Sequence, residues 1–211
     1  SYYASTNSFD EGHLVDLAGE LSRYGSDRSG TAAIAGGERA AAYPFSISKD
    51  PGGVPVEEKL SLVRNFESMA RKMESRITQI RVMYRDTRQN VRIATTAEGM
   101  KNDSRVQVVL TVLLVGRDGS EMQTSYEAVG GFHGFEFFTD ELMEGLARKT
   151  VRRLQGLLAA REAPMGMKTV VLASEAGGTM IHEAVGHGLE ADLAMEGLSC
   201  YKGLLGAGIA S

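Results

Sequence analysis

The residues with the clearest chemical potential in this chain are His182, Glu183 and His187, in the run Ile181-His-Glu-Ala-Val-Gly-His-Gly188. The chain has four histidines, and two of them lie here. Two neutral imidazoles beside a carboxylate can hold a metal ion, with the carboxylate acting as general base on an attacking water. We therefore predict that His182 and His187 bind a metal and that Glu183 is the base. The alternative is a pair of ordinary histidines on a glycine-weakened helix.

The spacing of the two histidines differs from the His-Glu-x-x-His pattern of many zinc peptidases, in which they are four residues apart on one helix. Here they are five residues apart. On a regular α-helix, residues i and i+4 differ by roughly 40° around the axis and residues i and i+5 by roughly 140°. Gly186 and Gly188 weaken the helix on both sides of His187. We therefore expect a local unwinding of the π type that brings both rings to one face.

A catalytic zinc usually has three protein ligands, so the motif needs one more. The nearby candidates are Glu190, Asp192, Glu196 and Cys200. We expect Glu190 and Asp192 to be hydrogen-bond partners of a ligand or structural residues rather than ligands. Cys200 could bind zinc or be a small buried hydrophobe. His13 and His133 have no partner at a ligand spacing, and we interpret them as structural or surface histidines.

The bulk composition is that of a globular protein, with 43% hydrophobic and 24% charged residues. No apolar run is long enough to cross a membrane, and the N-terminus lacks a secretory signal pattern. The single cysteine, Cys200, excludes an internal disulfide and fits a reducing cytoplasm. A net charge of -4 argues against direct nucleic-acid binding. The basic residues of 148–153 follow acidic ones at 140–144, which is the usual charge order of a helix.

The periodicity before Pro164 predicts an α+β domain. Asn7 or Ser8 can cap a helix that ends at Gly25, and residues 26–53 are expected to form a loop with one short strand. Amphipathic helices are expected at 56–74 and from Thr139 or Asp140 through Leu158, the latter terminated by Pro164. Four strands are expected between them, at 77–86, 90–96, 104–116 and 121–130. The short links, with the best hairpin signal at Asp118-Gly119, favour an antiparallel four-stranded meander with packed helices.

After Pro164 the pattern changes, and we expect a second domain there. A strand is expected at 168–173, a turn at Gly177-Gly178, and a helix capped by Thr179 that carries the histidines. The predicted division is therefore an N-terminal domain at 1–163 and the beginning of a C-terminal domain at 164–211. Both chain ends are interpreted as cuts. We expect the N-terminal domain to lack its first strands and the C-terminal domain to lack most of its length.

The segment Thr179-Met-Ile-His-Glu-Ala-Val-Gly-His-Gly-Leu-Glu-Ala-Asp192 resembles the signature of the TldD/PmbA family, zinc metalloproteases once named modulators of DNA gyrase. His-Glu-x-x-x-His followed by Gly-Leu-Glu-x-Asp is typical of the TldD-type subunit, whereas the PmbA (TldE) type lacks the histidines. The order of parts is also similar to that family, so the resemblance covers the whole chain.

The resemblance implies a cytosolic zinc peptidase that trims unfolded or leader-bearing peptides and works in a heterodimer with a PmbA/TldE-like partner. It assigns zinc binding to His182 and His187 and catalysis to Glu183. Its third ligand is a distal cysteine, expected beyond Ser211, and Cys200 lies too close to the motif to be that residue.

The resemblance therefore predicts that these 211 residues carry an incomplete site and are inactive alone, with zinc absent from this piece. One alternative is a non-catalytic peptide-binding or assembly subunit of the same family, without a competent metal. Another is a regulator of DNA, against which the acidic charge balance speaks.

Overall fold

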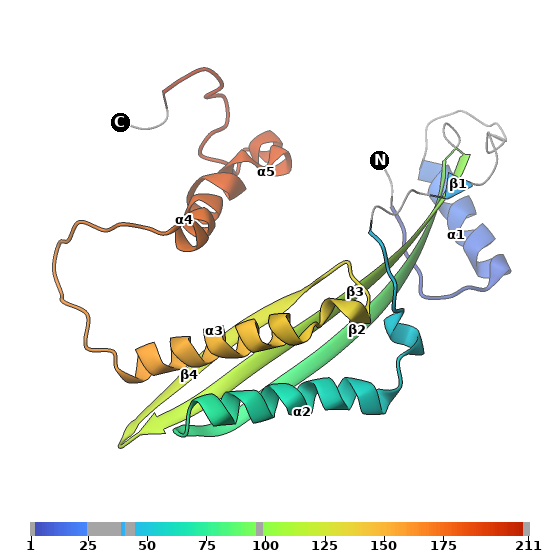
Figure 1. Ribbon diagram of the computed structural model, residues 1–211. Coiled ribbons are helices and arrows are strands. Elements are labelled where there is room, and N and C mark those ends of the chain that lie inside the picture. Colours follow the sequence, from blue (N-terminus) through green and yellow to red (C-terminus); the bar gives the residue numbers. More distant parts are fainter. Residues whose placement is uncertain (1–2, 25–38, 41–44, 96–98, 209–211) are drawn as a thin grey trace. The chain divides into compact units, whose positions relative to one another are not determined.

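The computed structural model describes residues 3–24, 39–40, 45–95 and 99–208 (Figure 1). The chain divides into two compact units, Ser1–Ala160 and Arg161–Ser211, and each is described by itself. Most of the expected loop at 26–53, including Gly36-Gly37, lies outside the described residues. Among the residues that are described, no helix combines the length and apolar character that a membrane crossing needs.

The first unit is built on three long antiparallel strands, β2 (Ile77–Thr95), β3 (Gly99–Asp118) and β4 (Glu121–Gly131). β3 lies in the middle, with β2 along its whole length on one side and β4 along its second half on the other. A two-residue strand, β1 (Arg39–Ala40), pairs in parallel with the first half of β3. Figure 1 shows the long β2–β3 ribbon extending past the end of β4.

The predicted four-stranded meander is wrong at its first turn, because the strands expected at 77–86 and 90–96 are one continuous strand. Arg88 and Gln89, placed in the predicted link, pair with Val106 and Arg105 of β3. Residues 87–90 are exposed, so their polarity reflects exposure of the ribbon and not a change of chain direction. The expected turn after Asp118 is present, with a φ of +59° at Gly119.

Two amphipathic helices, α2 (Val56–Met73) and α3 (Asp140–Leu158), lie along the same face of the sheet (Figure 1). The side chains of Leu110, Val112 and Leu114 alternate toward these helices and are fully buried, together with Phe66 of α2 and Leu154 of α3. This single apolar layer is the core of the unit. The α+β class and both helices are therefore confirmed.

Helix α3 begins and ends at the predicted residues, but its predicted terminator is wrong. The hydroxyl of Thr139 accepts a hydrogen bond from the backbone N–H of Leu142, which is an N-cap. The helix ends at Leu158, six residues before Pro164, so the proline does not terminate it. Residues from Ala159 to 173 are exposed, and helical turns there would have no core to pack against.

Glu74, the residue that follows α2, ties this helix to the sheet and to α3. Its buried carboxylate accepts hydrogen bonds from the backbone N–H and the guanidinium of Arg76, each at 2.9 Å, and from the amide of Gln155 at 3.0 Å. Arg76 also donates to Asp118 at 2.7 Å, at the end of β3. These hydrogen bonds lower the pKa of Glu74 from 4.5 to about 2, those from Arg76 being the main cause.

Helix α1 (Glu11–Tyr24) forms as expected, but its cap differs from the prediction. The carboxylate of Asp10, and not Asn7 or Ser8, accepts the hydrogen bond from the backbone N–H of His13. None of its residues is buried.

Two short 3₁₀ turns, η1 (Pro51–Gly53) and η2 (Phe135–Phe137), precede α2 and α3. The segment before η1 is fastened to η2 by Glu136, whose carboxylate accepts hydrogen bonds from the backbone N–H groups of Ser48 and Lys49.

The second unit consists of short helical turns: α4 (Ser174–Ile181), a π-helical turn η3 (His182–Gly186), a 3₁₀ turn η4 (His187–Leu189) and α5 (Ala191–Glu196). The strand expected at 168–173 is absent, because these residues pair with no strand among those described. Gly177 and Gly178 lie inside α4, and Thr179 is not its cap, since the helix already begins at Ser174. The turn predicted from the Gly177-Gly178 pair is therefore wrong, because both glycines continue the helix.

Candidate metal centre

The backbone of the histidine motif is unwound by one residue, as its five-residue spacing predicts. The N–H of His187 donates to the carbonyl of His182, five residues earlier, and residues His182–Gly186 form a π-helical turn. A Cβ at position 186 would lie 3.7 Å from Nδ1 of His182, an ordinary contact distance. Gly186 therefore favours the distortion through its low helix propensity and not through a steric need.

The π-helical turn brings both imidazoles to the same side of the helix. The ring centroids of His182 and His187 are 4.6 Å apart, with the ring planes at 75°. One nitrogen of each ring and a carboxylate oxygen of Glu183 all lie within 4.8 Å of one another. Two ligands of one tetrahedral zinc ion are separated by roughly 3.4 Å, given bonds of about 2.1 Å. The donor types, imidazole nitrogen and carboxylate oxygen, are among those that bind zinc.

Two carboxylates hold the ring of His187 from opposite sides. Oε1 of Glu190 lies 2.5 Å from Nδ1, and Oε2 of Glu183 lies 3.5 Å from Nε2. The hydrogen bond to Glu190 and its charge raise the pKa of His187, with a smaller contribution from Glu183. With the Nδ1 proton donated to Glu190, Nε2 keeps its lone pair free for a metal, and it lies 3.5 Å from Oε2 of Glu183. A carboxylate behind a ligating histidine is a common way to fix its tautomer and orientation.

None of the other candidates for a third ligand joins this group among the described residues. Glu190 is occupied by His187, in agreement with the expected supporting contact. The carboxylate of Asp192 accepts a hydrogen bond from the N–H of Leu193 in α5. Cys200 is exposed, so it is not the buried hydrophobe that was one of its two interpretations.

The group lies open to solvent in this unit. His182, Glu183 and His187 are all exposed, and the side chains of His187 and Glu183 retain 50% and 64% of their accessible surface. A hydrolytic site functions best when water is restricted and the substrate is held. The described part of the second unit therefore brings the three side chains together but does not enclose them.

The two remaining histidines make local contacts elsewhere. The ring of His133 stacks on Phe137 at 4.3 Å, and Nε2 of His13 lies 3.0 Å from the hydroxyl of Thr6. Neither belongs to a cluster of metal-binding side chains in the described parts of the chain.

Sequence reasoning missed two residues that contact the motif from a later loop. The hydroxyl of Tyr201 donates to the carbonyl of Ala184 at 3.3 Å, and the hydroxyl of Ser199 donates to the carbonyl of Gly188. The only signal in the sequence was Gly188 itself. A Cβ there would come within 2.4 Å of Cε2 of Tyr201, so the ring occupies the space that a side chain would need.

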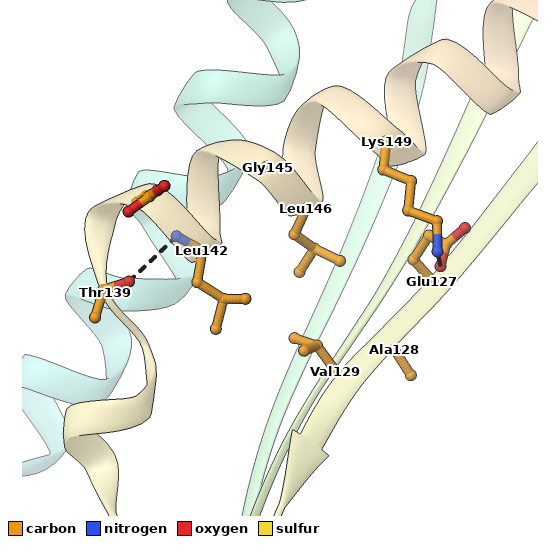
Figure 2. Close-up of a pocket in the computed structure, with 9 residues that line it drawn as sticks. Glu127, Ala128, Val129, Thr139, Leu142, Gly145, Leu146 and Lys149 are labelled. Atoms are coloured by element: carbon orange, nitrogen blue, oxygen red, sulfur yellow. Dashed lines mark hydrogen bonds and ion pairs between the residues drawn. The ribbon is translucent and has the colours of Figure 1, made fainter.

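The first unit has a pocket of about 500 Å³ between β4 and α3 (Figure 2). Figure 2 shows Leu142, Leu146 and Val129 lining it, with Lys149 directed at Glu127 at one end. Arg153 also pairs with the same carboxylate, at 2.6 Å. The pocket is lined mostly by apolar side chains, together with Thr139, Glu141 and the Glu127–Lys149 pair, and no histidine lines it.

Fold and site together define a class: an α+β domain followed by a segment whose π-distorted helix carries a His-Glu-x-x-x-His group that could hold a metal ion. Residues 49–158, just over half of the chain, match the PmbA/TldA metallopeptidase central domain, and residues 165–211 match the C-terminal domain of the same family. The chain belongs to the PmbA/TldD family of metallopeptidases.

Relatives agree with this placement. A metalloprotease of Methanothermobacter thermautotrophicus is 34% identical over 78% of this chain and 36% of its own length. A TldD homologue of Haemophilus influenzae, also a metalloprotease, is 29% identical over 74% of this chain and 33% of its own.

A solved structure from Bacteroides thetaiotaomicron, a candidate modulator of DNA gyrase, shares the fold. Its TM-score is 0.69 at 16% identity, covering 99% of this chain and 48% of that one. The chain spans about a third of the length of these curated relatives and about half of the solved one.

Proposed function

We propose that this chain contributes the metal-binding part of a zinc-dependent peptidase of the TldD type. His182 and His187 are the zinc ligands and Glu183 is the general base. The observation that carries the proposal is the π-helical turn, which sets two imidazoles and a carboxylate within 4.8 Å of one another despite the five-residue spacing.

When zinc is bound at such a site, it acts as a Lewis acid toward the peptide carbonyl and lowers the pKa of water. Glu183 takes a proton from the attacking water and passes it to the leaving amine. Its position 3.5 Å from Nε2 of His187 supports this role, because the base then lies beside the ligand nitrogen. Glu190 holds the His187 ring by its other nitrogen.

The remaining features of the proposal concern the whole protein. Residues 1–163 and 164–211 belong to separate domains, and the third zinc ligand is a cysteine beyond Ser211. The natural substrates are unfolded or leader-bearing peptides, cleaved in the cytoplasm by a heterodimer with a PmbA/TldE-like subunit. Nucleic acid and membrane are not partners. The three motif residues are exposed within their own unit, which supports the proposal that other parts of the whole protein enclose the site.

The deciding experiment compares zinc content and cleavage of an unstructured peptide by the intact protein with its partner subunit. Glu183→Gln should keep its zinc and lose cleavage by about 10²–10⁴-fold, because only the base is removed. Glu196→Gln, an exposed carboxylate on α5, is the matched control and should cleave normally. Cleavage by Glu183→Gln at the wild-type rate would refute the assignment. A wild-type assembly that neither binds zinc nor cleaves would favour the non-catalytic subunit instead.

A further inference from the structure

The loop at 199–201 contacts the backbone on both sides of His187. Tyr201 donates its hydroxyl to the carbonyl of Ala184, three residues before the histidine, at 3.3 Å. Ser199 donates its hydroxyl to the carbonyl of Gly188, one residue after it. The same hydroxyl accepts a hydrogen bond from the backbone N–H of Tyr201 at 3.0 Å, which joins the two contacts into one unit.

The ring of Tyr201 adds a steric contact to these hydrogen bonds. A Cβ built at position 188 would lie 2.4 Å from Cε2 and 2.7 Å from Cδ2 of Tyr201. Real Cβ atoms do not approach a ring so closely, so only glycine lets the ring rest against this backbone. The conformation of the motif is therefore fixed from outside the helix as well as by its own glycines.

We propose that Tyr201 and Ser199 are positioning residues for the metal pair, and that they hold the π-helical turn in the form that brings His182 and His187 together. The competing form is a regular α-helix, in which the two rings are rotated by roughly 140° from each other. Carbonyls pinned at 184 and 188 disfavour that rewinding, because it would shift both relative to the 199–201 loop. This proposal rests on the proposed zinc site for its functional meaning, but the contacts that Tyr201 and Ser199 make with the motif are a property of the metal-free backbone.

The first test is made on the metal-free intact protein, by amide hydrogen exchange at His187. Tyr201→Ala and Ser199→Ala should each raise its exchange rate by about tenfold, since the N–H of His187 makes the π-type bond to His182. Tyr126→Phe, an exposed tyrosine on β4, is the control and should leave the rate unchanged. Exchange within twofold of wild type in both loop variants would overturn the proposal, whatever the protein does with zinc.

The second test is zinc affinity, measured by competition with a chromophoric chelator. Tyr201→Phe keeps the ring and loses only the hydroxyl. It should weaken zinc binding about threefold to tenfold, which is no more than the smallest loss of metal affinity usually seen when a supporting residue is replaced. Gly188→Ala should weaken it at least tenfold when Tyr201 is present, and less than twofold in a Tyr201→Ala background. Equal effects of Gly188→Ala in both backgrounds would contradict the steric contact. If the wild type binds no zinc, the proposed function fails, while the exchange measurement still tests whether Tyr201 and Ser199 hold the π-helical turn.

Discussion

Glu190 contacts the ring of His187 directly, with Oε1 of the carboxylate 2.5 Å from Nδ1 of the ring. The contact leaves Nε2 as the nitrogen that faces Glu183 at 3.5 Å and gives the ring a fixed orientation before any metal arrives. Glu190 is thereby a supporting residue of the proposed centre and not its third ligand.

Replacing Glu190 should weaken zinc binding without abolishing it. In Glu190→Gln the amide oxygen can still accept from Nδ1, but the negative charge that makes His187 more basic is gone. We expect the zinc dissociation constant of the intact protein to rise about tenfold, and further in Glu190→Ala. Chelator competition measures it, with Glu196→Gln as the control. An unchanged constant in Glu190→Ala would show that the contact does not support the ligand.

Gly186→Ala tests whether the unwinding of the motif depends on helix propensity. The new Cβ would contact His182 at an ordinary 3.7 Å, so it introduces no clash. Alanine favours a regular helix by about 1 kcal/mol over glycine, which corresponds to roughly a fivefold shift toward the form with diverging rings. Zinc affinity should fall by about that factor. A variant that binds zinc as tightly as wild type would mean that the surrounding contacts alone determine the π-helical turn.

The core of the first unit predicts a contrast between two leucines of β3. Leu110 is fully buried against the helices, whereas Leu113 faces the other side of the sheet and is only half-buried. Leu110→Ala should lower the free energy of unfolding by about 2–5 kcal/mol because it opens a cavity, and Leu113→Ala by less than half as much. Urea denaturation measures both. Similar losses at the two positions would contradict the assignment of faces.

Glu74 should make the stability of the first unit depend on pH in the acid range. Its pKa in the folded state, about 2, lies below the ordinary value of 4.5, so the folded state stabilises the charged form. This contribution is fully present above about pH 5 and is lost as the pH falls from there toward 2. Urea midpoints at pH 7 and pH 3 should differ less in Glu74→Gln than in wild type. The exposed Glu121→Gln is the control and should retain the wild-type difference in urea midpoint. If Glu74→Gln retained that difference too, Glu74 would not be the cause of the pH dependence.

Periodicity and spacing were sufficient where local sequence decides the structure. The stripes around Phe66 and Leu146 predicted α2 and α3, and the glycines beside His187 predicted the π-helical turn. The errors came from residues whose role depends on distant parts of the chain. Polar residues at 87–90 continue a strand because β3 pairs with them.

The contacts that the loop at 199–201 makes with the motif could likewise not be predicted from the spacing of residues in the sequence. The space that Gly188 leaves for Tyr201 is created only when the later loop folds back on the motif. Of the nearby candidates for a third ligand, Glu190 contacts Nδ1 of His187, and none joins the group of His182, Glu183 and His187 among the described residues.

Zinc stoichiometry of the intact protein and two histidine variants tests the central claim most directly. After dialysis against trace zinc, elemental analysis should find about one zinc ion per wild-type chain. His182→Ala and His187→Ala should each retain less than about a tenth of that amount, while His133→Ala, whose ring stacks on Phe137, should match the wild type. Full zinc content in both motif variants would contradict the account, because the metal would then be held by other residues.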